Sequence, residues 1–187
     1  PFTLPALSLY PAALLRSHPF PMEVHSIESI VGALNDAGVR YLIVGGLAVN
    51  AHGYERLTRD LDLVIGLEPG NIMRGLQALV AIGYVPAIPI TPEEFAAPER
   101  REKWRAEKNM LVLKLWSDRH RRTPIDVFVH EPFDFAREYS AAKWMPIASG
   151  VMAPVIGYEG LLDMKAKAGR DKDLADVAAL RKLDPHR

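Results

Sequence analysis

The feature that most constrains this chain is a pair of aspartates, Asp60 and Asp62, at the start of the apolar run Leu61–Ile65. Such a run predicts a β-strand. Side chains alternate along a strand, so the two carboxylates share one face and the aliphatic side chains point to the core. Two anionic groups this close repel each other unless a cation lies between them or water solvates both. The pair is therefore either a site for a Mg²⁺-type cation or a solvated strand entry.

The composition is that of an ordinary globular protein. The chain has 187 residues, of which 49% are hydrophobic, and this predicts one domain or one domain with a small helical appendage. The formal net charge is zero, so no overall field attracts nucleic acid or membrane. The absence of cysteine excludes disulfides, thiol catalysis and thiolate zinc sites. No apolar run is long enough to span a bilayer, and we expect a cytoplasmic protein without a membrane partner.

The chain divides into three parts. Residues 1–21 contain five prolines and a single charged residue, and we expect an upstream extension that carries no chemistry. Residues 22–157 are predicted to form the catalytic core. Residues 158–187 are predicted to add C-terminal helices that pack on this core.

Hydrophobic periodicity and glycine or proline breaks predict the elements of an α/β (α+β) domain. The predicted strands are 40–44, 61–65, 110–116, 124–129, 143–147 and 151–155. The predicted helices are 27–38, 47–52, 71–81, 99–108, 158–169 and 171–183. The four prolines of 86–98 predict that this segment is largely loop.

Two further features strengthen the cation interpretation of the aspartate pair. Gly45 and Gly46 form a turn between the strand 40–44 and the next helix, where the backbone can approach a phosphate group. Asp126 interrupts the apolar strand 124–129, and a lone carboxylate there is costly without a partner. Three carboxylates and a phosphate-binding turn are the parts that nucleotidyl or phosphoryl transfer with Mg²⁺ requires.

The motifs resemble those of a known enzyme superfamily. Residues 44–48, 52–53, 56–63 and 124–128 resemble the signature of DNA polymerase β-like nucleotidyltransferases, in which a Gly-Gly or Gly-Ser turn precedes an Asp-x-Asp pair. Residues 162–165 and 169–177 resemble the helices of its AbiEii-like branch, which includes the MenT-type toxins. The resemblance implies a nucleotidyltransferase core: a short mixed β-sheet flanked by helices and closed by a C-terminal helical pair.

The resemblance also implies roles for individual residues. Asp60 and Asp62 would bind both Mg²⁺ (or Mn²⁺) ions, and Asp126 would bind the ion that activates the acceptor hydroxyl and help to deprotonate it. The catalytic residues would be Asp60, Asp62, Asp126 and Lys165. The residues that would bind the NTP are Gly45, Gly46, Arg56, Thr58, Lys165, Arg170 and Asp173. Asp173 or Asp176 would orient Lys165 or Arg170.

The implied function is transfer of a nucleoside monophosphate from an NTP such as ATP to an acceptor hydroxyl. In the AbiEii/MenT-like branch the acceptor would be a tRNA 3′ end or a protein, and the enzyme would be a toxin with a cognate antitoxin. Two alternatives stay open, an antibiotic nucleotidyltransferase and a catalytically silent module that binds a nucleotide or a partner.

Simpler interpretations exist for several of these residues. Asp126 could pair with a structural arginine, Arg56 or Arg59. Lys165 falls on the buried stripe of its helix, where a lysine either extends to solvent or meets an anion. Histidines 52 and 130 are expected to be packed or capping residues rather than ligands.

Two basic clusters are candidates for an RNA surface. The first lies in 100–108 around Trp104, which would act as a stacking platform, and the second in the loop 119–122. A solvated helix and a charged loop are the simpler interpretation, and the interspersed Glu99, Glu102 and Glu107 favour it for the first cluster.

Overall fold

A computed structural model of the chain describes residues 22–148 and 150–183, so the predicted extension 1–21 lies outside the described residues. The strands are β1 Tyr41–Ile43, β2 Leu61–Ile65, β3 Val85–Pro86, β4 Val112–Trp116, β5 Ile125–Phe128, β6 Lys143–Ala148 and β7 Val151–Val155. The helices are α1 Val24–Asp36, α2 Gly45–Ala51, α3 Pro69–Ala81, α4 Pro92–Ala96, α5 Pro98–Lys108, α6 Phe135–Ala141, α7 Tyr158–Ala168 and α8 Asp171–Leu183.

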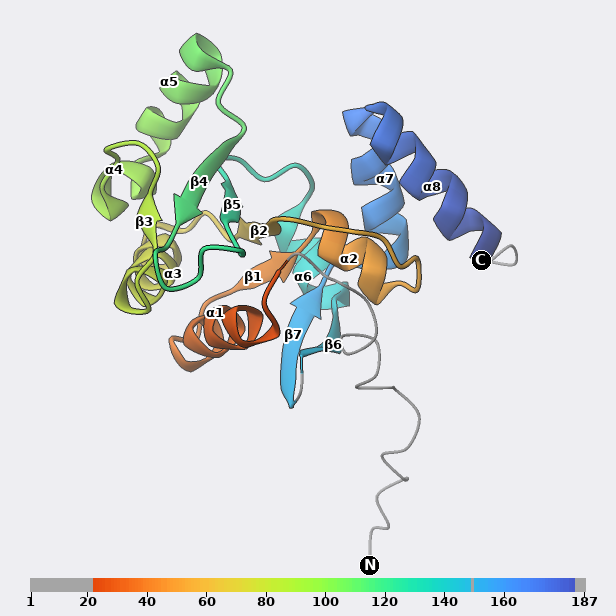
Figure 1. The fold of residues 1–187 in the computed structure, drawn as a ribbon. Coiled ribbons are helices and arrows are strands. Elements are labelled where there is room, and N and C mark those ends of the chain that lie inside the picture. Colours follow the sequence, from red (N-terminus) through yellow and green to blue (C-terminus); the bar gives the residue numbers. More distant parts are fainter. Residues whose placement is uncertain (1–21, 149, 184–187) are drawn as a thin grey trace, which may run out of the picture.

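The strands form one mixed sheet with the order β3-β4-β5-β2-β1-β7-β6 (Figure 1). The central strand β2 pairs antiparallel with β1 and parallel with β5. A strand inside a mixed sheet is covered on both sides, and four of the five residues of β2 are accordingly buried. The exception is Asp62, which is partly exposed on the face opposite the leucines.

The two faces of β2 meet different helices. Ile65 packs against α3 at Gly75, where an added Cβ would lie 3.2 Å from the Ile65 side chain. Asp62 lies on the other face against the first residue of α2, Gly45. The C-terminal helices α7 and α8 pack on each other, and α7 also contacts α2 (Figure 1). Both the aspartate pair and the glycine turn are therefore on the side of the sheet that carries α2.

The sequence predicts most of these elements, and the predicted α/β class is confirmed. Strand β2 has the predicted bounds, and α1 is followed by Gly38 at φ +60°. The left-handed conformation there suits glycine because it lacks a Cβ, and it ends the helix. Helices α7 and α8 form the predicted C-terminal pair.

The prediction of a loop over 86–98 is wrong for Pro92–Ala96, which forms α4. Thr91 accepts a hydrogen bond from the Glu94 backbone N–H, and the Glu94 carboxylate accepts one from the Thr91 N–H. This reciprocal capping box stabilises the first turn, and a proline at its start costs nothing because that N–H has no helical partner. The short α6, capped by the Asp134 side chain, was not predicted either.

Helix α5 confirms the predicted helix in the charged segment but is not fully solvated. Trp104 is buried and stacks on Phe95 of α4, with ring centroids 6.4 Å apart. Arg101 is also buried and donates a hydrogen bond to the Phe95 carbonyl oxygen at 2.6 Å. The prediction of Trp104 as a stacking platform for RNA is therefore wrong, because its ring is used in packing.

Across residues 22–148 and 150–183, no helix combines the length and apolarity that crossing a membrane requires.

Candidate functional site

The site is a row of charged side chains on adjacent strands. In the parallel pair of β2 and β5, Asp62 lies opposite Asp126, and in the antiparallel pair of β5 and β4, Asp126 lies opposite Lys114. Residues that pair directly across strands share a face of the sheet. Asp60 precedes β2 and continues the same alternation. The predicted carboxylates are therefore gathered on one face of two neighbouring strands.

Electrostatic crowding is strongest at Asp62. The pKa of this carboxyl is raised to about 6, chiefly by burial and in addition by the neighbouring charges of Asp60 and Asp126. A hydrogen bond from the Gly46 backbone and the charge of Lys165 act in the opposite direction. A carboxyl crowded by two others favours any arrangement that adds a cation.

The two glycines of the turn allow the backbone to approach this carboxylate. Gly45 has φ +63°, and a Cβ at this position would overlap the Asp62 carboxylate. A Cβ on Gly46 would collide with the Thr58 hydroxyl and would lie 3.2 Å from Nη2 of Arg56. Both positions therefore exclude larger residues, and Arg56 and Thr58 lie beside the turn.

The predicted lysine is held in a buried ion network. Lys165 is only 5% exposed, and its Nζ lies 2.9 Å from Asp173 Oδ1 and 2.8 Å from Asp176 Oδ2. Both aspartates are buried as well. Of the two possibilities for Lys165, the lysine meets anions and does not extend to solvent.

Two arginines form ion pairs with the aspartates of this network. Arg170 Nε lies 2.5 Å from Asp173 Oδ2, and the carboxylate raises the pKa of this guanidinium. Arg56 Nε lies 2.6 Å from Asp176 Oδ1, and its Nη2 donates to Asp176 Oδ2 at 2.9 Å. Asp173 thus contacts both Lys165 and Arg170, whereas Asp176 contacts Lys165 and holds Arg56 beside the glycine turn.

Lys114 is a site residue that sequence reasoning missed. Its Nζ lies 3.0 Å from Asp126 Oδ1, so Asp126 pairs with a lysine of β4 and not with Arg56 or Arg59. Alternation along β4 predicts an outward-facing lysine, but only the pairing register shows that it meets Asp126. Within the described ranges, no group of three or more His, Cys, Asp and Glu side chains already has metal-binding geometry.

His52 and His120 make structural contacts, as expected for His52. Its Nε2 hydrogen-bonds with the Ile156 carbonyl oxygen at 2.8 Å. His120 of the basic loop is buried, stacks on Tyr84 and hydrogen-bonds with Ser26 at 2.9 Å. The basic loop therefore presents only its arginines to solvent.

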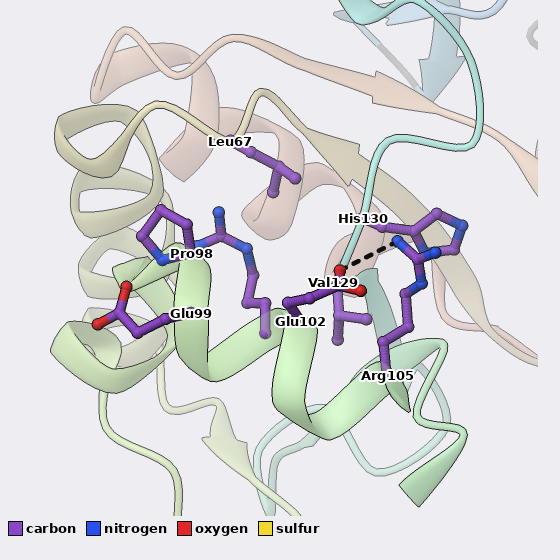
Figure 2. A pocket seen from close by; sticks show the side chains of 8 residues that line it. Leu67, Pro98, Glu99, Glu102, Arg105, Val129 and His130 are labelled. Atoms are coloured by element: carbon purple, nitrogen blue, oxygen red, sulfur yellow. Dashed lines mark hydrogen bonds and ion pairs between the residues drawn. The ribbon is translucent and has the colours of Figure 1, made fainter. Parts of the chain in front are cut away.

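A cavity of about 400 Å³ lies elsewhere, between α5 and the segments that follow β2 and β5 (Figure 2). Figure 2 shows Glu102 and Arg105 of α5 beside His130, with Glu102 and Arg105 joined by an ion pair of 3.4 Å. Burial lowers the pKa of His130. None of the predicted site residues lines this cavity.

Comparison with known proteins supports the fold. No protein-family model matches the sequence, and a search of curated proteins finds no significant match. Among solved structures, the crystal structure of a "putative nucleotidyltransferase" from Thermotoga maritima matches with a TM-score of 0.52 and 13% sequence identity. The match covers 88% of this chain and 93% of that chain. The chain has the fold of that protein.

This finding confirms the predicted nucleotidyltransferase core at the level of the fold. An identity of 13% establishes no more than the fold, because residues can differ at every functional position of a shared fold. Function must therefore be argued from the site itself.

The buried network yields a stability prediction. Replacing Lys165 by methionine leaves Asp173 and Asp176 buried without their shared ammonium, and we expect the free energy of unfolding to fall by about 3 kcal/mol. Lys167→Met on the exposed face of the same helix is the control, with an expected change below about 0.5 kcal/mol. Urea denaturation of both variants measures the difference, and equal losses would contradict a structural role for Lys165.

The raised pKa of Asp62 yields a second prediction. The folded protein binds this proton more tightly than the unfolded chain, so the stability that protonation provides is present below pH 4 and is lost as the pH rises through about 6. Asp62→Asn removes the charge, and we expect it to stabilise the fold by about 1–3 kcal/mol at pH 7.5.

Urea denaturation at pH 7.5 and pH 4, without divalent cations, measures this effect. The gain of the Asp62→Asn variant should shrink toward zero at pH 4, where the wild-type carboxyl is protonated. Asp36→Asn at the exposed end of α1 is the matched control, and water already solvates its charge. A destabilised Asp62→Asn variant at pH 7.5 would contradict the crowding of the carboxylates.

Proposed function

We propose that this protein is a Mg²⁺-dependent nucleotidyltransferase that moves a nucleoside monophosphate from an NTP to an acceptor hydroxyl. The observation that carries the proposal is the row of Asp60, Asp62 and Asp126 on one face of adjacent strands, directly beside the Gly45 turn. Hard oxygen donors of this kind suit Mg²⁺ or Mn²⁺. The raised pKa of the Asp62 carboxyl, caused by burial and by the charges of Asp60 and Asp126, supports a cation site, because a bound cation would stabilise the ionised form.

In this proposal, the order of strands in the sheet would separate a donor side from an acceptor side. Gly45 and Gly46 adjoin β2 on the side of β1, where their backbone and Arg56 would hold the phosphates of the NTP. The Gly46 N–H is hydrogen-bonded to Asp62, so Arg56 is the stronger candidate for direct phosphate contact. The leaving pyrophosphate would therefore depart over the glycine turn.

In-line displacement requires the attacking oxygen on the side of the phosphorus opposite to the leaving group. The acceptor hydroxyl would then approach over β5 and β4, beside Asp126. This carboxylate would accept the hydroxyl proton while the oxygen forms its bond to the α-phosphorus and the bond to pyrophosphate breaks. When bound, Mg²⁺ would supply charge neutralisation for the phosphate oxygens and lower the pKa of the hydroxyl.

Lys165 has a supporting part in this scheme. Its ammonium is directed at Asp173 and Asp176 and lowers the pKa of the Asp62 carboxyl through space. We therefore assign it mainly to holding the C-terminal helices and the charge balance of the site. Arg56 and Arg170, which share its carboxylates, are better placed as NTP ligands because each is more exposed than Lys165.

The strands beyond Asp126 carry exposed side chains that would contact the acceptor. Trp116 of β4 follows Lys114 on the same face, is 46% exposed and lies opposite Val85, which is also exposed. Arg119 and Arg121 follow in the exposed loop. An exposed indole next to cationic side chains suits stacking of a nucleobase and pairing with phosphate. These residues favour a tRNA 3′ end over a protein acceptor.

The AbiEii/MenT-like branch gives this acceptor a biological setting. Its C-terminal signature falls on Lys165, Arg170, Asp173 and Asp176, which form one ion network here. The proposal therefore includes a toxin of a toxin–antitoxin system with a cognate antitoxin. An antibiotic nucleotidyltransferase is the second candidate, because a small hydroxylated acceptor would use the same carboxylates.

Incubation with each labelled NTP, Mg²⁺ and a single class of acceptor distinguishes these functions. Labelling of bulk tRNA supports the toxin-like enzyme, and labelling of a protein moves the acceptor to a polypeptide. Labelling of an aminoglycoside or lincosamide alone supports antibiotic modification. Binding of NTP without transfer to any acceptor would indicate that the protein is a catalytically silent nucleotide-binding module.

The carboxylate row gives the first functional prediction. Asp62→Asn should reduce transfer by about 10²–10³-fold or more, because the variant loses a carboxylate that would hold Mg²⁺, and the charge of this cation would stabilise the transition state. Circular dichroism should show an intact fold, and Asp36→Asn should keep the wild-type rate. A wild-type rate of transfer by the Asp62→Asn variant would show that this carboxylate is not part of the catalytic site.

The acceptor side gives another prediction. Trp116→Ala should raise the KM for the labelled nucleic-acid acceptor by about 5- to 100-fold, the range expected for loss of one stacked base. The KM for NTP should not change, since the phosphates lie on the other side of the carboxylates. Trp144→Ala is the matched control, because this indole is 52% exposed on β6 at the far edge of the sheet. Equal KM values for the two variants would contradict an acceptor on β4.

A further inference from the structure

The ion pair between Lys114 and Asp126 occupies a position that the proposed reaction reserves for a metal ion. Lys114 Nζ lies 3.0 Å from Asp126 Oδ1, within direct contact of the carboxylate oxygen. The Asp126 side chain is 13% exposed, whereas that of Lys114 is 52% exposed. A half-exposed ammonium therefore neutralises a mostly buried carboxylate.

The charges of the three carboxylates are compensated unequally. Asp126 has the ammonium of Lys114, but in the described part of the chain no lysine or arginine forms an ion pair with Asp60 or Asp62. The three carboxylates also fall short of a preformed metal-binding group in those residues. The unequal compensation and the incomplete metal-binding group have one explanation. Asp126 points toward Lys114 and becomes available to a metal ion only when the lysine moves away.

We propose that Lys114 is an intramolecular competitor of the divalent cation at Asp126. This inference rests on the proposed function, because it assigns a regulator to the same site. One carboxylate oxygen cannot hold an ammonium and a divalent cation together without strong repulsion between the two cations. Asp60 and Asp62 carry no competing ammonium, so they bind a cation first. The acceptor-side part of the site is completed only after Lys114 has moved away.

The chemistry of the pair suits competition and not permanent closure. Lysine is a compact charge on a flexible four-carbon chain, whereas arginine would bind the carboxylate through two parallel hydrogen bonds. The pair contributes little net free energy, because water solvates the half-exposed ammonium of Lys114 and competes with the carboxylate for it. The ion pair of Lys114 therefore neutralises Asp126 at low metal concentration, and a divalent cation displaces the lysine at higher concentration.

Binding of Mn²⁺ to the nucleotide-free protein tests the inference without reference to activity. The electron paramagnetic resonance signal of free Mn²⁺ gives the affinity of wild type, Lys114→Met and Lys143→Met. We expect Lys114→Met to bind Mn²⁺ about two- to fivefold more tightly, the range given by a half-exposed ion pair. Lys143→Met, the same change on β6 at the other edge of the sheet, should match wild type.

Two further variants identify the origin of the gain. In an Asp126→Asn background, Lys114→Met should give no increase in affinity, since the carboxylate for which lysine competes is gone. Lys114→Arg keeps the charge and should bind Mn²⁺ no more tightly than wild type. A lysine that merely oriented Asp126 would give the opposite result, with weaker Mn²⁺ binding in Lys114→Met.

The outcomes separate this inference from the proposed function. Equal or weaker Mn²⁺ affinity in Lys114→Met, with clear binding by wild type, would overturn the competition alone. An absence of Mn²⁺ binding up to millimolar concentration in every variant would overturn the metal site, and the competition with it.

Discussion

Repulsion among like charges on one face of the sheet is the constraint around which this structure is organised. Asp62 and Asp126 face each other across two parallel strands, and Asp60 adds a third carboxylate at the entry of β2. The ammonium of Lys114 at Asp126 and a backbone N–H at Asp62 offset part of this repulsion, and the pKa of Asp62 is still raised to about 6. A fold selected only for stability would replace such a group by apolar residues, so the cost indicates a function that needs the carboxylates.

The second charged cluster connects distant parts of the chain to that face. Asp176 of α8 holds Arg56, which lies beside the Gly46 turn, and shares Lys165 with Asp173. Buried charges of both signs are costly alone, so each member of the network requires the others. The C-terminal helices are in this way part of the site, because their carboxylates fix the guanidinium proposed to meet the NTP.

The sheet order assigns different tasks to its centre and its edge. The centre carries the carboxylates and the glycine turn, which any nucleotidyl transfer would use. The edge strand β3 and its neighbour β4 carry Lys114, Trp116 and Val85, which would govern metal occupancy and the acceptor. Under the proposed function, the chemistry and the acceptor specificity would therefore depend on different strands. The cavity beside α5 lies apart from both.

Local patterns in the sequence determined much of this protein. Alternation placed the β2 carboxylates on one face, and positive-φ glycines ended helices at the predicted positions. The prolines of 86–98 predicted a loop, whereas the structure has a capping box of Thr91 and Glu94 that begins α4. Tertiary structure alone decided that Lys114 meets Asp126, that Asp176 meets Arg56 and that Trp104 is buried. The physical reason is that periodicity fixes the direction of a side chain within its own element, whereas its partner depends on strand register and helix packing between residues far apart in the chain.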